Sequence, residues 1–145
     1  MTISFVMTTR EWLALTRSVS DFWFDSAIKD RDYVQNHKGH FPNRVRPWIK
    51  CADGFEVSVQ AGDGLYCSPC VNLEDGNYDT VELGYPSMVE ESILEYAENV
   101  DNPTETVYGQ VPVEVVDKLI LKHGGIVNLD DVAKWLNDKN YKIRG

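Results

Sequence analysis

Two closely spaced pairs of residues offer the clearest chemistry in the sequence. His37 and His40 form an H-x-x-H pair, and Cys67 and Cys70 form a C-x-x-C pair. Two imidazoles and two thiolates are a soft, tetrahedral ligand set that suits Zn²⁺. Because four protein ligands leave no open position on the metal, such an ion would be structural. The spacing therefore predicts a structural zinc site at His37, His40, Cys67 and Cys70.

A β-hairpin would bring these two pairs together. Alternating segments at 48–51 and 55–61 flank an Asp-Gly turn at 52–54, which is typical of a hairpin. In this register Cys51 lies opposite Phe55, and the region of Arg44 lies beside Gly62. The His pair precedes this hairpin and the Cys pair follows it, so both are expected at its open end.

Other interpretations of these residues stay open. The cysteines could be reduced thiols in a loop, with the His pair exposed to solvent. Cys51 could replace one His as a ligand, although its place at the hairpin tip favours a small buried or strand-edge residue. A thioredoxin-like redox role is disfavoured because no βαβ pattern surrounds the C-x-x-C motif.

An acidic stretch without basic residues is the second feature. No Lys or Arg lies between Lys50 and Lys118, and fifteen carboxylates fall in that interval. Since DNA presents about one negative charge per 1.7 Å of duplex axis, an acidic face fits a groove lined with Lys and Arg. The alternative is a solvated face of an acidic protein; direct binding of nucleic acid by this half is disfavoured in both cases. The expected partner-binding residues are Glu90, Glu91, Glu95, Glu98, Asp101 and Glu105.

Motifs for catalysis are missing from the sequence. There is no P-loop, dinucleotide fingerprint or nucleophile elbow, and no carboxylate is distinguished by its spacing. His123 ends an expected helix at 113–123, where the helix dipole favours a cation and Gly124 stops the helix. We therefore expect a capping role for His123 and no enzymatic activity.

Composition restricts the chain to a folded, single-domain class. It has 145 residues, 43% of them hydrophobic and 11% aromatic, with a formal charge of −9. This content excludes a wholly disordered chain. Three cysteines, no export signal and no membrane-length apolar run predict a cytoplasmic protein without a disulfide framework.

The order of elements predicts an α+β fold: a small antiparallel sheet packed with four to five helices. We expect one domain at 1–145, with an N-terminal helical part at 1–43 and an α+β part at 44–145. Thr8 or Thr9, followed by Glu11, indicates an N-capped helix that begins near Thr9. Ser87 and Glu90 have the spacing of a capping box, and Asn128 has the position of an N-cap. The strands are expected at about 44–61 (the hairpin), 78–85 and 106–111, and the helices at about 9–25, 87–97, 113–123 and 129–136.

Four blocks of sequence carry a resemblance. They are CADGFEVSVQAGDGLYCSP at 51–69, VELGYPS at 81–87, TETVYGQVPVEVV at 104–116 and KHGG at 122–125. In order and wording they resemble a family of small acidic proteins carried by phages and mobile elements of Firmicutes, over about residues 48–126. Cys70 stands where many relatives carry Arg, so the four-ligand metal site would belong to this chain and not to the family.

The resemblance implies a function by analogy. Small acidic proteins of mobile elements include anti-CRISPR inhibitors, which act in the cytoplasm of the bacterial host. The implied function is non-enzymatic inhibition of a basic nucleic-acid-handling defence protein, with the RNA-guided nuclease of a type II CRISPR system favoured, by blocking nucleic-acid loading. The alternative is a small metal-stabilised regulatory module with an unrelated protein partner.

Overall fold

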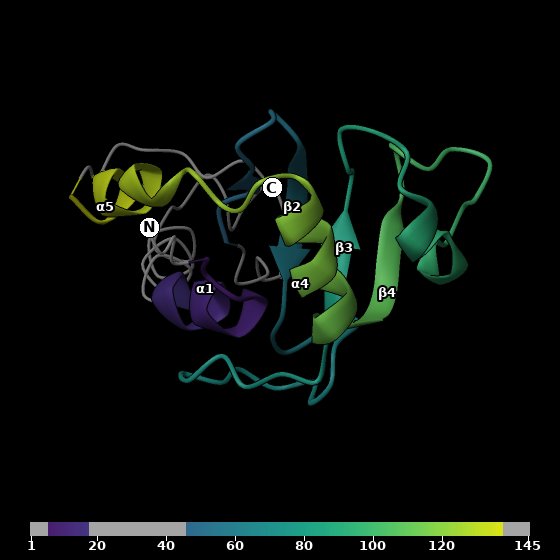
Figure 1. Ribbon diagram of the computed structural model, residues 1–145. Coiled ribbons are helices and arrows are strands. Elements are labelled where there is room, and N and C mark those ends of the chain that lie inside the picture. Colours follow the sequence, from purple (N-terminus) through teal and green to yellow (C-terminus); the bar gives the residue numbers. More distant parts are fainter. Residues whose placement is uncertain (1–5, 18–45, 138–145) are drawn as a thin grey trace, which may run out of the picture.

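Four antiparallel strands form one sheet in the computed structural model of the protein, in the order β1-β2-β3-β4 (Figure 1). The structure describes residues 6–17 and 46–137, without the side chains of 133 and 135–137. Each strand pairs with its neighbour in sequence, so the sheet is a meander. The strands are β1 Ile49–Lys50, β2 Glu56–Gln60, β3 Thr80–Gly84 and β4 Val107–Pro112.

The predicted hairpin is confirmed as β1 and β2. Ile49 lies opposite Val57, and the Cys51 N–H donates to the Phe55 carbonyl at 2.8 Å. Gly54 has a φ of +95° in the turn, a backbone conformation that favours glycine. The strands are shorter than 44–61, because β1 has only two residues.

β3 confirms the strand expected at 78–85, and the β-prone run at 106–111 becomes β4. The two strands make the longest ladder of the sheet, with an irregularity between Val81 and Leu83. Gln110 in β4 has a φ of +53°, and its Oε1 accepts hydrogen bonds from the hydroxyls of Ser68 and Thr80. The α+β expectation is therefore confirmed, with four strands in the described sheet.

Four helical segments lie in the described residues: α1 Thr9–Leu15, the 3₁₀ helix η1 Glu91–Tyr96, α4 Val113–Lys122 and α5 Leu129–Asn137. Thr8 and Glu11 cap α1 reciprocally, as the sequence indicates. The helix expected to continue to about 25 is shorter, because α1 ends at Leu15 with Thr16 as its C-cap; residues 18–25 lie outside the described part of the chain. No helix in the described ranges is long and apolar enough to cross a membrane.

Two predicted caps are wrong. The predicted helix does not start at Ser87: Glu90 is extended, with φ −127° and ψ 110°, and η1 follows it. The Ser87 hydroxyl instead accepts from the Glu56 N–H at 2.9 Å. The Asn128 side chain accepts from the Lys50 N–H and donates to the Trp48 carbonyl, so it binds β1.

The hydrophobic core lies between the sheet and the helices. Figure 1 shows α4 passing over one face of the sheet, with α1 beside it. Trp12 and Leu13 of α1 are fully buried. The Thr9 hydroxyl donates to Asp117 Oδ1 at 2.6 Å and joins α1 to α4. The N-terminal helix is therefore part of the core.

Candidate functional site

His123 lies at the C-terminal end of α4, where the sequence places it, but its side chain is buried. Only 4% of it is exposed, and the ring stacks on Phe55 with centroids 4.0 Å apart and planes at 11°. Gly124 and Gly125 follow with positive φ values and turn the chain away. The helix end thus points the imidazole into the protein.

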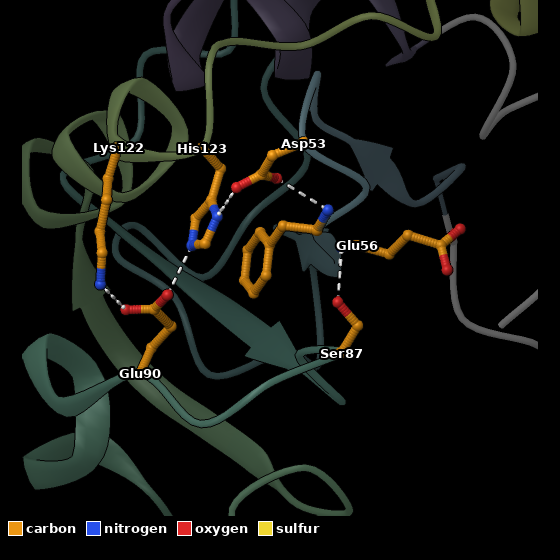
Figure 2. A network of polar contacts seen from close by, with 7 residues as sticks. Asp53, Glu56, Ser87, Glu90, Lys122 and His123 are labelled. Atoms are coloured by element: carbon orange, nitrogen blue, oxygen red, sulfur yellow. Dashed lines mark hydrogen bonds and ion pairs between the residues drawn. The ribbon is translucent and has the colours of Figure 1, made fainter.

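Both imidazole nitrogens face carboxylates. Nδ1 lies 2.6 Å from Asp53 Oδ2, and Nε2 lies 2.5 Å from Glu90 Oε1 (Figure 2). An ionised carboxylate only accepts hydrogen bonds, so each ring nitrogen must donate when both acids are ionised. His123 then carries a positive charge between two negative ones.

Lys122 extends this chain of alternating charges. Its Nζ lies 2.8 Å from Glu90 Oε2, so both oxygens of Glu90 are bonded. Glu90 is only 2% exposed, whereas the Asp53 side chain is 51% exposed. We call Asp53, His123, Glu90 and Lys122 the charge network.

The two acids have lowered pKa values. The hydrogen bond from the Phe55 N–H, followed by that from His123, lowers the pKa of Asp53. Burial alone would raise the pKa of Glu90, but the hydrogen bonds from Lys122 and His123 outweigh it and hold that pKa below its ordinary value. Both acids are therefore ionised near neutral pH, as the alternation of charge requires.

The charge network joins parts of the chain that are distant in sequence. Asp53 comes from the hairpin turn, Glu90 from the segment before η1, and Lys122 and His123 from the end of α4. The turn and the helix end also share backbone hydrogen bonds, from Ala52 N to Gly125 O and from Asp53 N to His123 O. Two of the four sequence blocks, at 51–69 and 122–125, thus meet at His123, and Glu90 joins them from outside the blocks.

A pocket of about 420 Å³ opens beside the charge network. It lies between η1 and α4, and Glu90 is one of its walls. Because both Glu90 oxygens are already bonded, this carboxylate is not free to act as a base on a bound molecule. The arrangement acts as a buried electrostatic clamp between three elements. The other lining residues are Val89, Glu91, Ser92, Lys118, Leu119 and Lys122.

Five of the six expected partner-binding carboxylates are exposed. Glu90 is the correction, since it is buried and bonded inside the protein. Within residues 6–17 and 46–137, the five exposed carboxylates make no ion pair with Lys, Arg or His. We call them the acidic surface. They are Glu91, Glu95, Glu98, Asp101 and Glu105.

Hydrogen bonds to β4 hold the loop that carries most of the acidic surface. The Glu98 N–H donates to the Val107 carbonyl at 3.0 Å, and the Asn99 N–H to the Thr106 hydroxyl at 3.2 Å. The Tyr108 hydroxyl donates to the Pro103 carbonyl. These contacts fix the loop on the edge strand, so its carboxylates have defined positions.

The two halves of the predicted metal site have different outcomes. His37 and His40 lie outside the described residues. Cys67 is buried and Cys70 is exposed, and both thiols donate to the Gly62 carbonyl, at 3.3 and 3.8 Å. In the described part of the chain, no three His, Cys, Asp or Glu residues are placed to hold a metal ion.

Cys51 lies far from the other two cysteines. It is buried at the hairpin tip, and burial, followed by the nearby Asp53 charge, raises its pKa to about 11. β2 separates the tip from Gly62, and five residues of strand span about 17 Å. Cys51 is therefore a poor alternative ligand for a site at Cys67 and Cys70.

Comparisons of the chain with known protein families, with characterised proteins and with solved structures find no match.

Proposed function

We propose that this protein is a non-enzymatic inhibitor that binds a basic nucleic-acid-handling protein through the acidic surface on η1 and the η1–β4 loop. The favoured partner is the RNA-guided nuclease of a type II CRISPR system in a bacterial host cell. One observation carries the proposal: five exposed carboxylates without basic partners in the described residues lie on η1 and on the following loop, which is held to β4.

Electrostatics supports binding to a basic groove. Exposed carboxylates gathered on one segment create a negative field that steers a positively charged partner and speeds association. Because backbone hydrogen bonds already order the loop, binding loses less conformational entropy there. Exposed apolar side chains add surface that a partner can bury: Met88 and Val89 just before η1, and Val100 in the loop.

The proposed inhibition is steric. The nuclease holds its guide and target in a positively charged channel that recognises the nucleic-acid backbone. An acidic protein seated in that channel excludes nucleic acid without making or breaking a bond.

Charge-matched variants test this proposal. The test variant is Glu98→Gln, Asp101→Asn, Glu105→Gln, and the control is Asp63→Asn, Glu74→Gln, Asp130→Asn, which removes the same charge from exposed positions elsewhere. Target-DNA cleavage by the purified nuclease is measured with each protein at low and high salt. We expect the test variant to lose about tenfold or more in inhibitory potency at low salt, with a weaker salt dependence, and the control to stay near wild type.

Two outcomes would overturn the proposal. In the first, the wild-type protein neither binds nor inhibits the nuclease. In the second, both variants lose potency equally, which would mean that net charge alone matters and that the acidic surface is not the contact.

A structural zinc ion at His37, His40, Cys67 and Cys70 remains part of the proposal, and of its alternative, a metal-stabilised regulatory module with another protein partner. Cys67 and Cys70 share the Gly62 carbonyl at the open end of the hairpin. Arg46, six residues after His40 in sequence, lies at that end and donates to the Ala61 carbonyl. We expect one zinc ion per chain by metal analysis and a large fall in melting temperature with chelator; protein without zinc would refute the site.

A further inference from the structure

The thiols of Cys67 and Cys70 converge on a single backbone oxygen. Cys67 Sγ lies 3.3 Å and Cys70 Sγ lies 3.8 Å from the Gly62 carbonyl oxygen. Each thiol also has a second carbonyl acceptor, Pro69 for Cys67 and Leu65 for Cys70. The two sulfur atoms therefore gather around one oxygen atom through weak hydrogen bonds, which a covalent bond between them could replace.

The loop around the pair is fixed by bonds that do not involve the thiol protons. The Gly62 N–H donates to Cys67 Sγ at 3.3 Å, and the Leu65 N–H donates to the Gly62 carbonyl. Ser68 donates from its backbone N–H to the Thr80 carbonyl. The chain between the cysteines is thus anchored to β3, and both thiols stay at the Gly62 carbonyl.

The two cysteines differ in their access to solvent. Cys70 is exposed, so a soluble oxidant reaches it first, whereas Cys67 is buried beside it. A reactive outer thiol with a neighbouring inner thiol is the arrangement in which an oxidised sulfur is captured by its neighbour.

We propose that Cys67 and Cys70 form a reversible intramolecular disulfide when the protein meets a peroxide. The Cys70 thiolate attacks the peroxide oxygen, which forms a sulfenic acid and releases water after protonation. Cys67 then attacks Cys70 Sγ, the sulfur–sulfur bond forms, and the sulfenic oxygen leaves as a second water molecule. The protein loses two hydrogen atoms and two electrons, hydrogen peroxide is reduced to two water molecules, and a thiol reductant reverses the reaction.

This inference goes beyond the proposed function and does not depend on it. It gives Cys67 and Cys70 a second reaction besides metal binding. The oxidised pair does not bind zinc, because a disulfide sulfur is no longer a thiolate ligand. Oxidation would therefore release any metal held there.

Thiol counting and mass spectrometry on chelator-treated full-length protein test the inference. Hydrogen peroxide is added, excess is removed, and free thiols are titrated after unfolding. We expect the count to fall from three to one, with a loss of two hydrogen atoms in the intact mass and a peptide crosslinked at Cys67 and Cys70. Dithiothreitol should restore all three thiols.

Cys51 supplies the matched control. The Cys51→Ser variant should still form the crosslink, whereas Cys70→Ser should keep both remaining thiols. Three thiols after peroxide, stable oxygen adducts on Cys70, or a crosslink between chains would each overturn the inference. Adding zinc before peroxide distinguishes the disulfide from the proposed metal site. Slower crosslinking indicates that the metal and the oxidant compete for the same two thiols. An unchanged rate counts against zinc binding at Cys67 and Cys70 and leaves the disulfide inference intact.

Discussion

His123 Nε2 and Glu90 Oε1 lie 2.5 Å apart at the end of α4, and both side chains are almost completely removed from solvent. A buried ion pair of this kind is weak support for net stability, because desolvation opposes the attraction. Losing one partner is different, since the remaining charge stays buried without compensation. The pair therefore serves best as a device that fixes the position of the segment leading into η1.

Replacing Glu90 should reveal the loss of stability that follows when a buried charge loses its partner. Glu90→Gln keeps the shape but offers an NH₂ group to one of two cationic donors, His123 and Lys122. We expect a loss of about 2–4 kcal/mol in the free energy of unfolding, measured by urea denaturation. The control Glu91→Gln, at the neighbouring exposed position, should change stability by less than about 0.5 kcal/mol. Equal effects of both variants would contradict a buried clamp.

The charge network should also make the fold sensitive to acid. The folded-state pKa values of Asp53 and Glu90 lie below their ordinary values of 3.8 and 4.5. For groups with depressed pKa values, the stabilisation is fully present above the unfolded pKa and is lost as the pH falls through the folded pKa. Stability should therefore decline as the pH is lowered below about 4.5.

Measuring urea midpoints from neutral to acidic pH checks this expectation. In the double variant Asp53→Asn, Glu90→Gln, the unfolding free energy should depend less on pH in the acid range. A wild-type slope that the double variant leaves unchanged would assign the acid sensitivity to other carboxylates.

Alanine substitutions at Gly124 and Gly54 distinguish the backbone cost of a side chain at positive φ from the cost of a steric clash. Both have similar backbone angles, with φ of +90° and +95°, but a Cβ at Gly124 would lie 2.8 Å from the Ala52 Cβ, whereas Gly54 has open space. Gly54→Ala should therefore cost only the backbone term, about 1–2 kcal/mol. Gly124→Ala should cost more, because the hairpin turn must also move.

A double-mutant cycle isolates that contact. Ala52→Gly removes the clashing Cβ and should recover part of the stability lost in Gly124→Ala, but none of that lost in Gly54→Ala. The measurement is again the free energy of unfolding. Additive effects of Ala52→Gly and Gly124→Ala would show that the turn and the helix end are not tightly packed.

Sequence patterns predicted the elements whose causes are local. The Asp-Gly turn at 52–54 fixes its hairpin within a few residues, and Thr8 and Glu11 cap α1 across three. The failures arise where a side chain found a distant partner. Ser87 bonds to Glu56, 31 residues away, and Glu90 bonds to His123, 33 residues away, so neither is available for the local capping box.

The candidate site shows the same division. Exposure of the acidic surface follows from a segment rich in carboxylates and without basic residues, which local composition reveals. Local composition does not reveal the charge network, because Asp53 and His123 are separated by 70 residues and only the fold brings them together. The D-G-F and K-H-G-G blocks were the available signal, but a single sequence does not indicate that they touch.

Asn128 gives the sharpest test of a distant partner against a local cap. As an N-cap, Asn128 could be replaced by Asp with little loss, because both side chains accept from the first helical N–H groups. In the structure the Nδ2 group donates to the Trp48 carbonyl at 2.8 Å, and Oδ1 accepts from the Lys50 N–H at 3.0 Å. An Asp carboxylate cannot donate and would face the Trp48 carbonyl.

We therefore expect Asn128→Asp to lose about as much stability as Asn128→Ala, about 1–3 kcal/mol by urea denaturation. A variant with Asp130→Asn, at an exposed position in the first turn of α5, controls for the change in charge near the helix start. If Asn128→Asp is as stable as wild type while Asn128→Ala is not, the side chain acts as a helix cap, and β1 is held to α5 by other contacts.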